Sequence, residues 1–362
     1  MTAAPPEPAA GPQPASRDPV KKINLALQGG GAHGAFTWGV LDYLLEDGRI
    51  AVSGLSGTSA GALNAVICVD GLARGGPKEA RKRLADFWRA VSIDGKLPAL
   101  QRKIVERMLN FTPLEGSPVQ AWLNVMSRYF SPYELNPLNI NPLKEVIERF
   151  VDFETVRSAS GIQLYVAATN VVTGRLRIFP RDKITADVVM ASAALPLVFQ
   201  AVTIDGTPYW DGGYMGNPAI FPFFRDSATE DVLIVQINPL ERREVPTSVH
   251  DIMNRINEIT FNSSLLAEYR AIEFVAREID LGRLPHGFGP GEYRRINAHR
   301  IVLGEGHTAY SADSKLSTDY DFFRMLHAGG RRAARHFLEA HFDDIGVRST
   351  FDLRAEAQAE WA

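Results

Sequence analysis

The first part of the sequence places a short apolar run, a glycine-rich turn and a helical pattern in that order, twice in succession. Residues 23–27 predict a buried strand, and residues 34–46 predict a helix because their apolar side chains recur at helical spacing. Residues 50–56 and 60–69 predict a second strand and a second helix. Consecutive strands that are joined through helices run parallel, with right-handed crossovers. This order therefore predicts an α/β fold with a mainly parallel central sheet.

Later segments extend the predicted sheet and add helices to it. Strands are expected at 163–171, 175–179 and 232–237, and amphipathic helices at 250–280 and 320–341. Between residues 96 and 145, six prolines interrupt short helical pieces. Because proline ends or kinks helices, we expect a helical insertion or cap there rather than sheet.

The two ends of the chain have compositions that do not favour a packed core. Residues 1–20 contain six prolines and almost no large apolar side chains, so they predict a disordered Pro/Ala-rich tail. Residues 346–362 predict a polar C-terminal tail, which leaves one domain over 21–345. We find no internal repeat.

Composition excludes several classes of protein. The chain has 39 Lys+Arg against 42 Asp+Glu, and this balance argues against a nucleic-acid binder. One cysteine in 362 residues excludes a disulfide scaffold and fits a reducing compartment. The sequence lacks an apolar run of spanning length and a secretory signal, so we expect a soluble, cytoplasmic protein. No metal or cofactor is expected, because His336 and His341 lack an accompanying carboxylate motif and no H-E-x-x-H occurs.

The first motif with chemical meaning is Gly57-Thr58-Ser59-Ala60-Gly61, which lies between a predicted strand and a predicted helix. The pattern G-x-S-x-G in this context is typical of a nucleophile elbow, where a sharp turn exposes the serine hydroxyl. Gly57 and Gly61 let the neighbouring backbone pass close to the turn. The alternative is a plain strand-to-helix turn with Ser59 near the N-cap.

The second motif, Gly29-Gly30-Gly31-Ala32-His33-Gly34, also follows a strand and opens a helix. It fits the dinucleotide fingerprint G-x-G-x-x-G, but the second strand ends without the acidic residue that holds a ribose. The better interpretation is an oxyanion hole formed by backbone N–H groups of Gly29, Gly30, Gly31 and Gly34, with Gly30 and Gly31 foremost. His33 is a candidate base, although a helix cap or a position at the cleft rim is the more common role.

The third motif is Asp211-Gly212-Gly213, at the end of a predicted strand. A serine hydroxyl is a poor nucleophile until a neighbouring group accepts its proton, and Asp211 is a candidate acceptor. Taken alone, Asp-Gly usually marks a surface turn. Gly212 and Gly213 would allow a tight turn directly after the carboxylate.

These three motifs together resemble the patatin-like phospholipase family. Two shorter blocks also resemble it: Ala191-Ser192-Ala193-Ala194-Leu195-Pro196 with Phe199, and Asn217-Pro218. The resemblance implies a three-layer α/β/α fold and a serine acyl hydrolase of lipid carboxylic esters that works through an acyl-enzyme. It implies Ser59 as nucleophile and Asp211 as proton acceptor in a dyad without histidine. Where the family often has Arg or Lys in the glycine loop, this chain has His33, so no fixed positive charge is expected beside the site.

Other functions stay open at this stage. A Ser–His–Asp esterase or thioesterase would need a histidine, and the candidates are His250, His286, His299 and His307. Polyester oligomers are a further substrate class, because pocket shape decides acyl specificity. A lipid- or nucleotide-binding module without catalysis is the alternative outside enzymes. Head group, acyl length, oligomeric state and regulation do not follow from the sequence.

Residues 97–111 combine apolar and basic side chains in a way that leaves two interpretations open. The apolar side chains recur at three- and four-residue steps: Leu97, Leu100, Ile104, Met108 and Phe111. A basic amphipathic helix can lie on an anionic bilayer, which predicts peripheral contact with the inner membrane surface. The same stripe can instead be the packed face of a cap. Vesicle co-sedimentation of Leu100→Glu and Ile104→Glu variants distinguishes the two.

Overall fold

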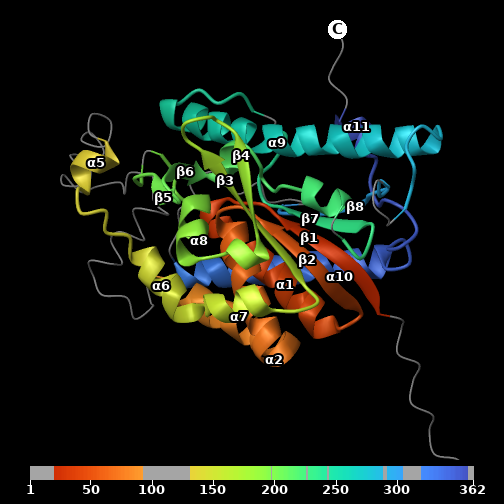
Figure 1. Ribbon diagram of the computed structural model, residues 1–362, viewed down its shortest axis with the longest axis horizontal. Coiled ribbons are helices and arrows are strands. Elements are labelled where there is room, and N and C mark those ends of the chain that lie inside the picture. The colour runs from red at the N-terminus through yellow and green to blue at the C-terminus, as the bar shows by residue number, and fades with distance from the viewer. Residues whose placement is uncertain are drawn as a thin grey trace, which may run out of the picture.

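A mostly parallel sheet runs through the centre of the molecule in the computed structural model, which describes residues 20–92, 131–196, 198–225, 227–242, 244–287, 292–304 and 319–357 (Figure 1). The strand order is β5-β6-β3-β2-β1-β7-β8, and β4 pairs with β3 beside this path. The strands are β1 (Lys21–Leu27), β2 (Ile50–Gly57), β3 (Gln163–Asn170), β4 (Leu176–Pro180), β5 (Val202–Ile204), β6 (Thr207–Asp211), β7 (Asp231–Gln236) and β8 (Asn297–Val302).

The register of the central strands brings their carboxyl ends to one edge of the sheet. β1 pairs in parallel with both β2 and β7, and Leu27 lies opposite Gly57 on one side and Val235 on the other. β3 continues the parallel sheet beyond β2, whereas β4 and β6 run antiparallel to β3. Ligands bind open α/β sheets at such an edge.

Helices cover both faces of the sheet and complete three layers (Figure 1). One face carries α1 (Gly34–Asp47), α2 (Ala60–Ala90) and α10 (Tyr320–His341), whose buried side chains join the larger core cluster. The other face carries α9 (Val249–Asp280) and α11 (Leu353–Ala357), and the smaller cluster includes Leu265 and Tyr269 of α9. Shorter helices are α5 (Pro132–Leu135), α6 (Pro142–Phe150), α7 (Phe153–Ser158) and α8 (Ala186–Ser192).

The structure confirms the α/β fold class and the main predicted elements. β1, β2, α1, α9 and α10 follow the predicted ranges closely. α2 differs, because it continues to Ala90 across a break at Gly75 and Gly76 rather than ending at residue 69. β8 was not predicted, since its six residues include polar side chains that are buried, Asn297 and His299 among them.

Part of the predicted insertion lies outside the described residues. Only residues 131–145 of the range 96–145 are described, and they form α5 and the start of α6. The amphipathic segment 97–111 and the N-terminal range 1–19 also lie outside them. Among the residues that are described, no helix is both long enough and apolar enough to cross a bilayer.

The segment after residue 346 packs against the domain, although its composition predicts a polar tail. Thr350 donates its backbone N–H to the carbonyl of Ala298 in β8 at 3.0 Å, and the Phe351 ring contacts Tyr269 of α9. Arg300 of β8 pairs with Glu356 of α11 at 2.8 Å. Because few side chains make these contacts, composition alone does not reveal them.

Candidate active site

Ser59 lies at a sharp turn between β2 and α2, at the carboxyl edge of the sheet. Its φ of 53° and ψ of −121° are unusual for a residue other than glycine. Such strain persists only where the surroundings hold it, and it marks functional turns. A Cβ at Gly61 would overlap the Leu27 carbonyl oxygen, and one at Gly57 would lie 2.5 Å from the Gly61 oxygen. The glycines of the motif are therefore required by close backbone approach.

A serine from α8 holds the strained turn. The Ser59 backbone N–H donates to the Ser192 Oγ at 2.9 Å, and Ser192 is fully buried. Two residues further on, the Ala194 carbonyl accepts the backbone N–H of Asp211 at 2.9 Å. The block 191–196 therefore connects the turn that carries Ser59 to the strand end that carries Asp211.

Asp211 ends β6 with its side chain completely buried, and the Ser59 side chain is close enough to interact with it. Its Oδ1 accepts the Gly213 N–H at 2.7 Å. Burial raises the pKa of Asp211 to about 7, while the Gly213 N–H and the Ser59 hydroxyl partly oppose this shift. Among the described residues, no donor reaches Oδ2 with hydrogen-bonding geometry. One carboxylate oxygen is thus held in place and the other is available to accept a proton.

The glycine loop passes directly over Ser59. A Cβ on Gly29 would lie 2.7 Å from both the Ser59 Cβ and the Thr58 carbonyl oxygen. The loop then forms a single 3-10 turn, η1 (Gly31–His33), which begins with a positive φ of 59° at Gly31. The glycine loop and the serine turn, which follow neighbouring strands of the sheet, therefore lie in contact with each other.

The four expected donor amides of this loop differ in what they bind. Gly29 donates its N–H to the Asn217 Oδ1 at 2.6 Å, and Gly34 donates back to carbonyls of the same turn. Gly30 and Gly31 lie at the start of the 3-10 turn, where N–H groups have no acceptor within the turn. Hydrogen bonding therefore leaves Gly30 and Gly31 as the candidates to receive an oxyanion.

Buried amide side chains surround the same loop, and the sequence motifs did not reveal most of them. Asn238 donates from Nδ2 to the Gly29 carbonyl at 2.7 Å, and Gln28 and Asn262 are buried next to it. Only Asn217 belonged to a predicted block. The signal that could have found Asn238 is its dipeptide, since Asn238-Pro239 follows a buried strand and repeats the Asn217-Pro218 pair.

His33 is buried rather than placed at a cleft rim, with 2% of its surface exposed. It occupies the N-cap position of α1, but its side chain makes no capping hydrogen bond. Its ring lies 6.4 Å from that of Phe322 in α10. His33 is therefore a buried side chain that contacts α10 at the start of α1.

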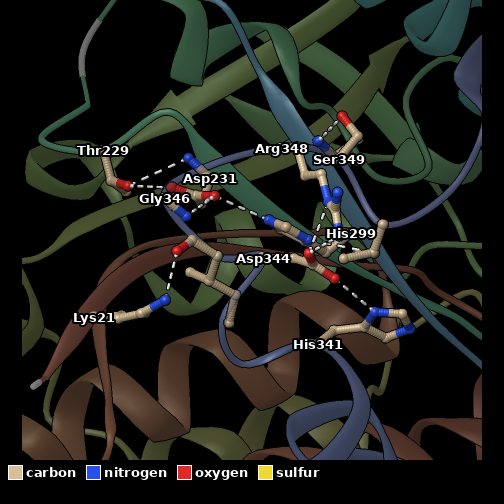
Figure 2. Close-up of polar contacts among 12 residues, drawn as sticks. Lys21, Thr229, Asp231, His299, His341, Asp344, Gly346, Arg348 and Ser349 are labelled. Carbon is tan, nitrogen blue, oxygen red and sulfur yellow. Dashed lines mark hydrogen bonds and ion pairs between the residues drawn. The ribbon is translucent and has the colours of Figure 1, made fainter. Parts of the chain in front are cut away.

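The histidines considered for a Ser–His–Asp site lie elsewhere or outside the described side chains. His299 Nε2 lies 2.9 Å from Asp231 Oδ1, and this pair is at the amino-terminal edge of the sheet, near Lys21 (Figure 2). Gly346 also donates its N–H to Asp231 Oδ1, at 2.7 Å. His286 is an exposed partner of Glu230. The side chain of His250 and all of His307 are not described.

No group of three or more His, Cys, Asp or Glu side chains among the described residues could hold a metal ion. The polar groups gathered at the carboxyl edge are instead a hydroxyl, a carboxyl and backbone amides. This set suits acyl transfer, which needs a nucleophile, a proton acceptor and a site for an oxyanion.

The chain was compared with protein families and with solved structures. The family profile described as patatin-like phospholipase matches residues 25–224, which include all three motifs. Among solved structures, VipD from Legionella pneumophila is 15% identical, with a TM-score of 0.39 over 89% of this chain and 67% of that one. ExoU from Pseudomonas aeruginosa, in complex with SpcU, is 16% identical, with a TM-score of 0.29 over 68% of this chain and 51% of that one.

A human GIVD cytosolic phospholipase A2, in complex with a fluorophosphonate inhibitor, is 10% identical, with a TM-score of 0.37 over 93% of this chain and 60% of that one. The chain thus spans about half to two thirds of the lengths of these proteins. No curated protein sequence matches the chain. Because the family profile covers more than half of the 362 residues, the chain belongs to the patatin-like phospholipase family, a family of lipid hydrolases.

Proposed function

We propose that the protein is a serine acyl hydrolase that cleaves carboxylic esters of lipids through Ser59 and Asp211. The main support is that a buried carboxyl group, with its pKa raised to about 7, lies beside a serine at a strained turn. A general base works best when its pKa is near the working pH, and an ordinary exposed aspartate is too weak a base for a serine hydroxyl. Family membership makes lipid esters the first substrate class to test.

In the proposed first step, the Ser59 Oγ attacks the ester carbonyl carbon while Asp211 Oδ2 accepts the hydroxyl proton. The carbonyl π electrons move to oxygen, and the N–H groups of Gly30 and Gly31 receive that oxyanion. When the tetrahedral intermediate collapses, the bond to the alcohol oxygen breaks and Asp211 returns its proton to the leaving alkoxide. The products of this step are the free alcohol and an acyl-enzyme ester on Ser59.

Hydrolysis of the acyl-enzyme uses the same groups with water as nucleophile. Asp211 accepts a proton from water as the water oxygen attacks the acyl carbon, and the same two amides receive the second oxyanion. Collapse breaks the bond to Ser59 Oγ, which regains the proton held by Asp211. The fatty acid leaves and the starting state is restored, with no metal or cofactor in either step.

Fluorophosphonate labelling, combined with turnover of an acyl ester panel, tests the assignment. We expect the probe to add one phosphonyl group to Ser59, and we expect Ser59→Ala to be neither labelled nor active. The matched control is Ser263→Ala, because Ser263 is exposed on α9 and bonds only locally, to the Thr260 carbonyl at 2.7 Å. Turnover by Ser59→Ala at the wild-type rate would reject the proposal.

The panel also separates the alternative functions. Lipid esters, soluble esters, thioesters and hydroxyalkanoate oligomers are compared on the wild-type protein, each against Ser59→Ala. A binding module without catalysis would take up lipid or nucleotide but show neither labelling of Ser59 nor turnover. A Ser–His–Asp enzyme would lose activity when one of its histidines is replaced.

A further inference from the structure

The Gly29 peptide groups are held from both sides by buried asparagine side chains. Asn217, which follows β6, accepts the Gly29 N–H on its Oδ1 at 2.6 Å. Asn238, which follows β7, donates from Nδ2 to the Gly29 carbonyl at 2.7 Å, and the Asn217 Nδ2 approaches the same oxygen at 3.4 Å. Both asparagines are buried, so water does not compete for these bonds.

Gln28 connects the two asparagines to each other. Its Oε1 accepts the backbone N–H of Asn238 at 3.0 Å and the Asn238 Nδ2 at 3.1 Å. Its Nε2 donates to the Asn217 carbonyl at 3.1 Å and to the Asn262 Oδ1 at 3.1 Å. Buried amides stabilise a structure only when their groups are paired, and a fully bonded set of this kind fixes one geometry.

The bonds to Gly29 have a direct consequence for Gly30, because one peptide group contains both the Gly29 carbonyl and the Gly30 N–H. A peptide group is planar and almost always trans, so its N–H points opposite to its C=O. Whatever fixes the Gly29 oxygen therefore fixes the direction of the Gly30 N–H. Asn238 thus orients the Gly30 N–H through its bond to the Gly29 carbonyl.

We propose that Asn217, Asn238 and Gln28 are positioning residues that orient the oxyanion-binding amides of the glycine loop. This inference rests on the proposed function, because it concerns the same reaction. An oxyanion site stabilises the transition state only if its donors are already aligned before the charge develops. Loss of the Asn238 donor lets the peptide group between Gly29 and Gly30 rotate, and the alignment is lost although the nucleophile and the base remain.

The test compares Asn238→Ala and Asn217→Ala with Asn24→Ala as matched control. Asn24, in β1, is equally buried, but it donates from Nδ2 to the Ser227 Oγ at 2.6 Å, on the amino-terminal side of β7 and away from the glycine loop. For the two loop variants we expect kcat to fall about 10- to 100-fold with KM within about twofold of wild type. Asn24→Ala should keep the wild-type kcat per folded molecule, even if its melting temperature falls equally.

A second readout separates positioning from a general loss of structure. Each variant is assayed on an ester and on the matching thionoester, in which sulfur replaces the carbonyl oxygen. Sulfur is a weak hydrogen-bond acceptor, so a thionoester gains little from aligned amides. We expect the ratio of kcat/KM for ester over thionoester to fall about tenfold or more in the loop variants and to stay unchanged in Asn24→Ala.

The outcomes distinguish this inference from the proposed function. If the wild-type protein has no Ser59-dependent turnover, the proposed function fails and the inference with it. If the wild type is active and Asn238→Ala keeps its kcat, or loses ester and thionoester turnover equally, the inference alone is overturned. Should Asn238→Ala not fold, Asn238→Leu keeps the side-chain volume without the donor, and the same two outcomes apply to it.

Discussion

The backbone of Gly29 passes so close to Ser59 that a Cβ on Gly29 would lie 2.7 Å from the Cβ of the serine. No rotation of a side chain relieves such an overlap, because the Thr58 carbonyl oxygen lies at the same distance. The glycine loop and the serine turn therefore form a single unit. Any residue larger than glycine at position 29 must move one of them.

We therefore predict that Gly29→Ala loses at least about 100-fold in turnover, since small displacements of reacting groups are costly. Its free energy of unfolding should fall by about 1–3 kcal/mol from overpacking. Gly329→Ala is the control, because its added Cβ would lie in α10 with the nearest atoms at 3.9 Å. That variant should be fully active and as stable as wild type or slightly more so. Ester assays and urea denaturation of both variants measure these effects.

The pH dependence of activity should follow the ionisation of Asp211. The base is active only when deprotonated, and burial raises its pKa to about 7. We therefore expect kcat/KM to rise with pH through about 7 and to fall tenfold per pH unit well below it. Initial rates between pH 5 and 9 on a neutral ester measure this profile. A profile that is flat from pH 5 to 8 would contradict the role of Asp211.

Asp211→Asn should be inactive and yet more stable than wild type at pH 8. In the folded protein the pKa of Asp211 lies above its ordinary value of 3.8, so the folded state binds the proton more tightly than the unfolded state. The contribution of Asp211 to the free energy of unfolding of the wild type therefore decreases as pH rises from about 4 to about 7. Asparagine keeps an acceptor for the Gly213 N–H but carries no charge to bury.

The stability difference between Asp211→Asn and wild type should be about 1–4 kcal/mol at pH 8 and should shrink towards pH 5. Urea denaturation of both proteins at the two pH values measures it, and comparison at equal pH cancels the contribution of other groups. A variant that is less stable than wild type at pH 8 would count against a buried carboxylate of raised pKa at this position.

Ser192→Ala should weaken the turn that presents Ser59. The Ser59 N–H would lose its acceptor at 2.9 Å, which we expect to lower the free energy of unfolding by about 1–2 kcal/mol. Labelling of Ser59 by a fluorophosphonate should slow about tenfold, because the strained backbone relaxes. Ser158→Ala, exposed at the last residue of α7, is the control, and both its labelling rate and its stability should match wild type. Equal labelling rates for the two variants would show that Ser192 does not hold the turn.

His299→Ala should lower stability but leave catalysis intact. Its partner Asp231, in β7, also accepts the backbone N–H of Gly346 (Figure 2). The pair therefore connects the C-terminal segment to β7 and β8. Removing one partner of a buried hydrogen bond costs about 1–3 kcal/mol. Below the variant's melting temperature, turnover per folded molecule should equal that of wild type, as it should for His250→Ala, His286→Ala and His307→Ala. Loss of turnover in any of the four would favour a Ser–His–Asp site.

Some elements were predictable because their signals are local. The helical spacing of apolar residues in α1 and α10, and the apolar runs of β1 and β7, depend only on neighbours in sequence. β8 could not be predicted in this way, because His299 is a polar residue whose burial depends on a hydrogen bond to Asp231 in β7. The packing of Phe351 on Tyr269 could not be predicted either, because the two residues are far apart in the sequence.

Local patterns along the chain were enough to predict the fold class and the three motifs, because glycine sterics and apolar periodicity act over a few residues. The folded structure was needed to show which of the four loop amides are already bonded, which groups Ser192 and Asn238 bind, and that Asp211 is buried beside Ser59. These properties depend on strand register and on contacts between segments 100 or more residues apart, and no local pattern encodes the distance between two such segments.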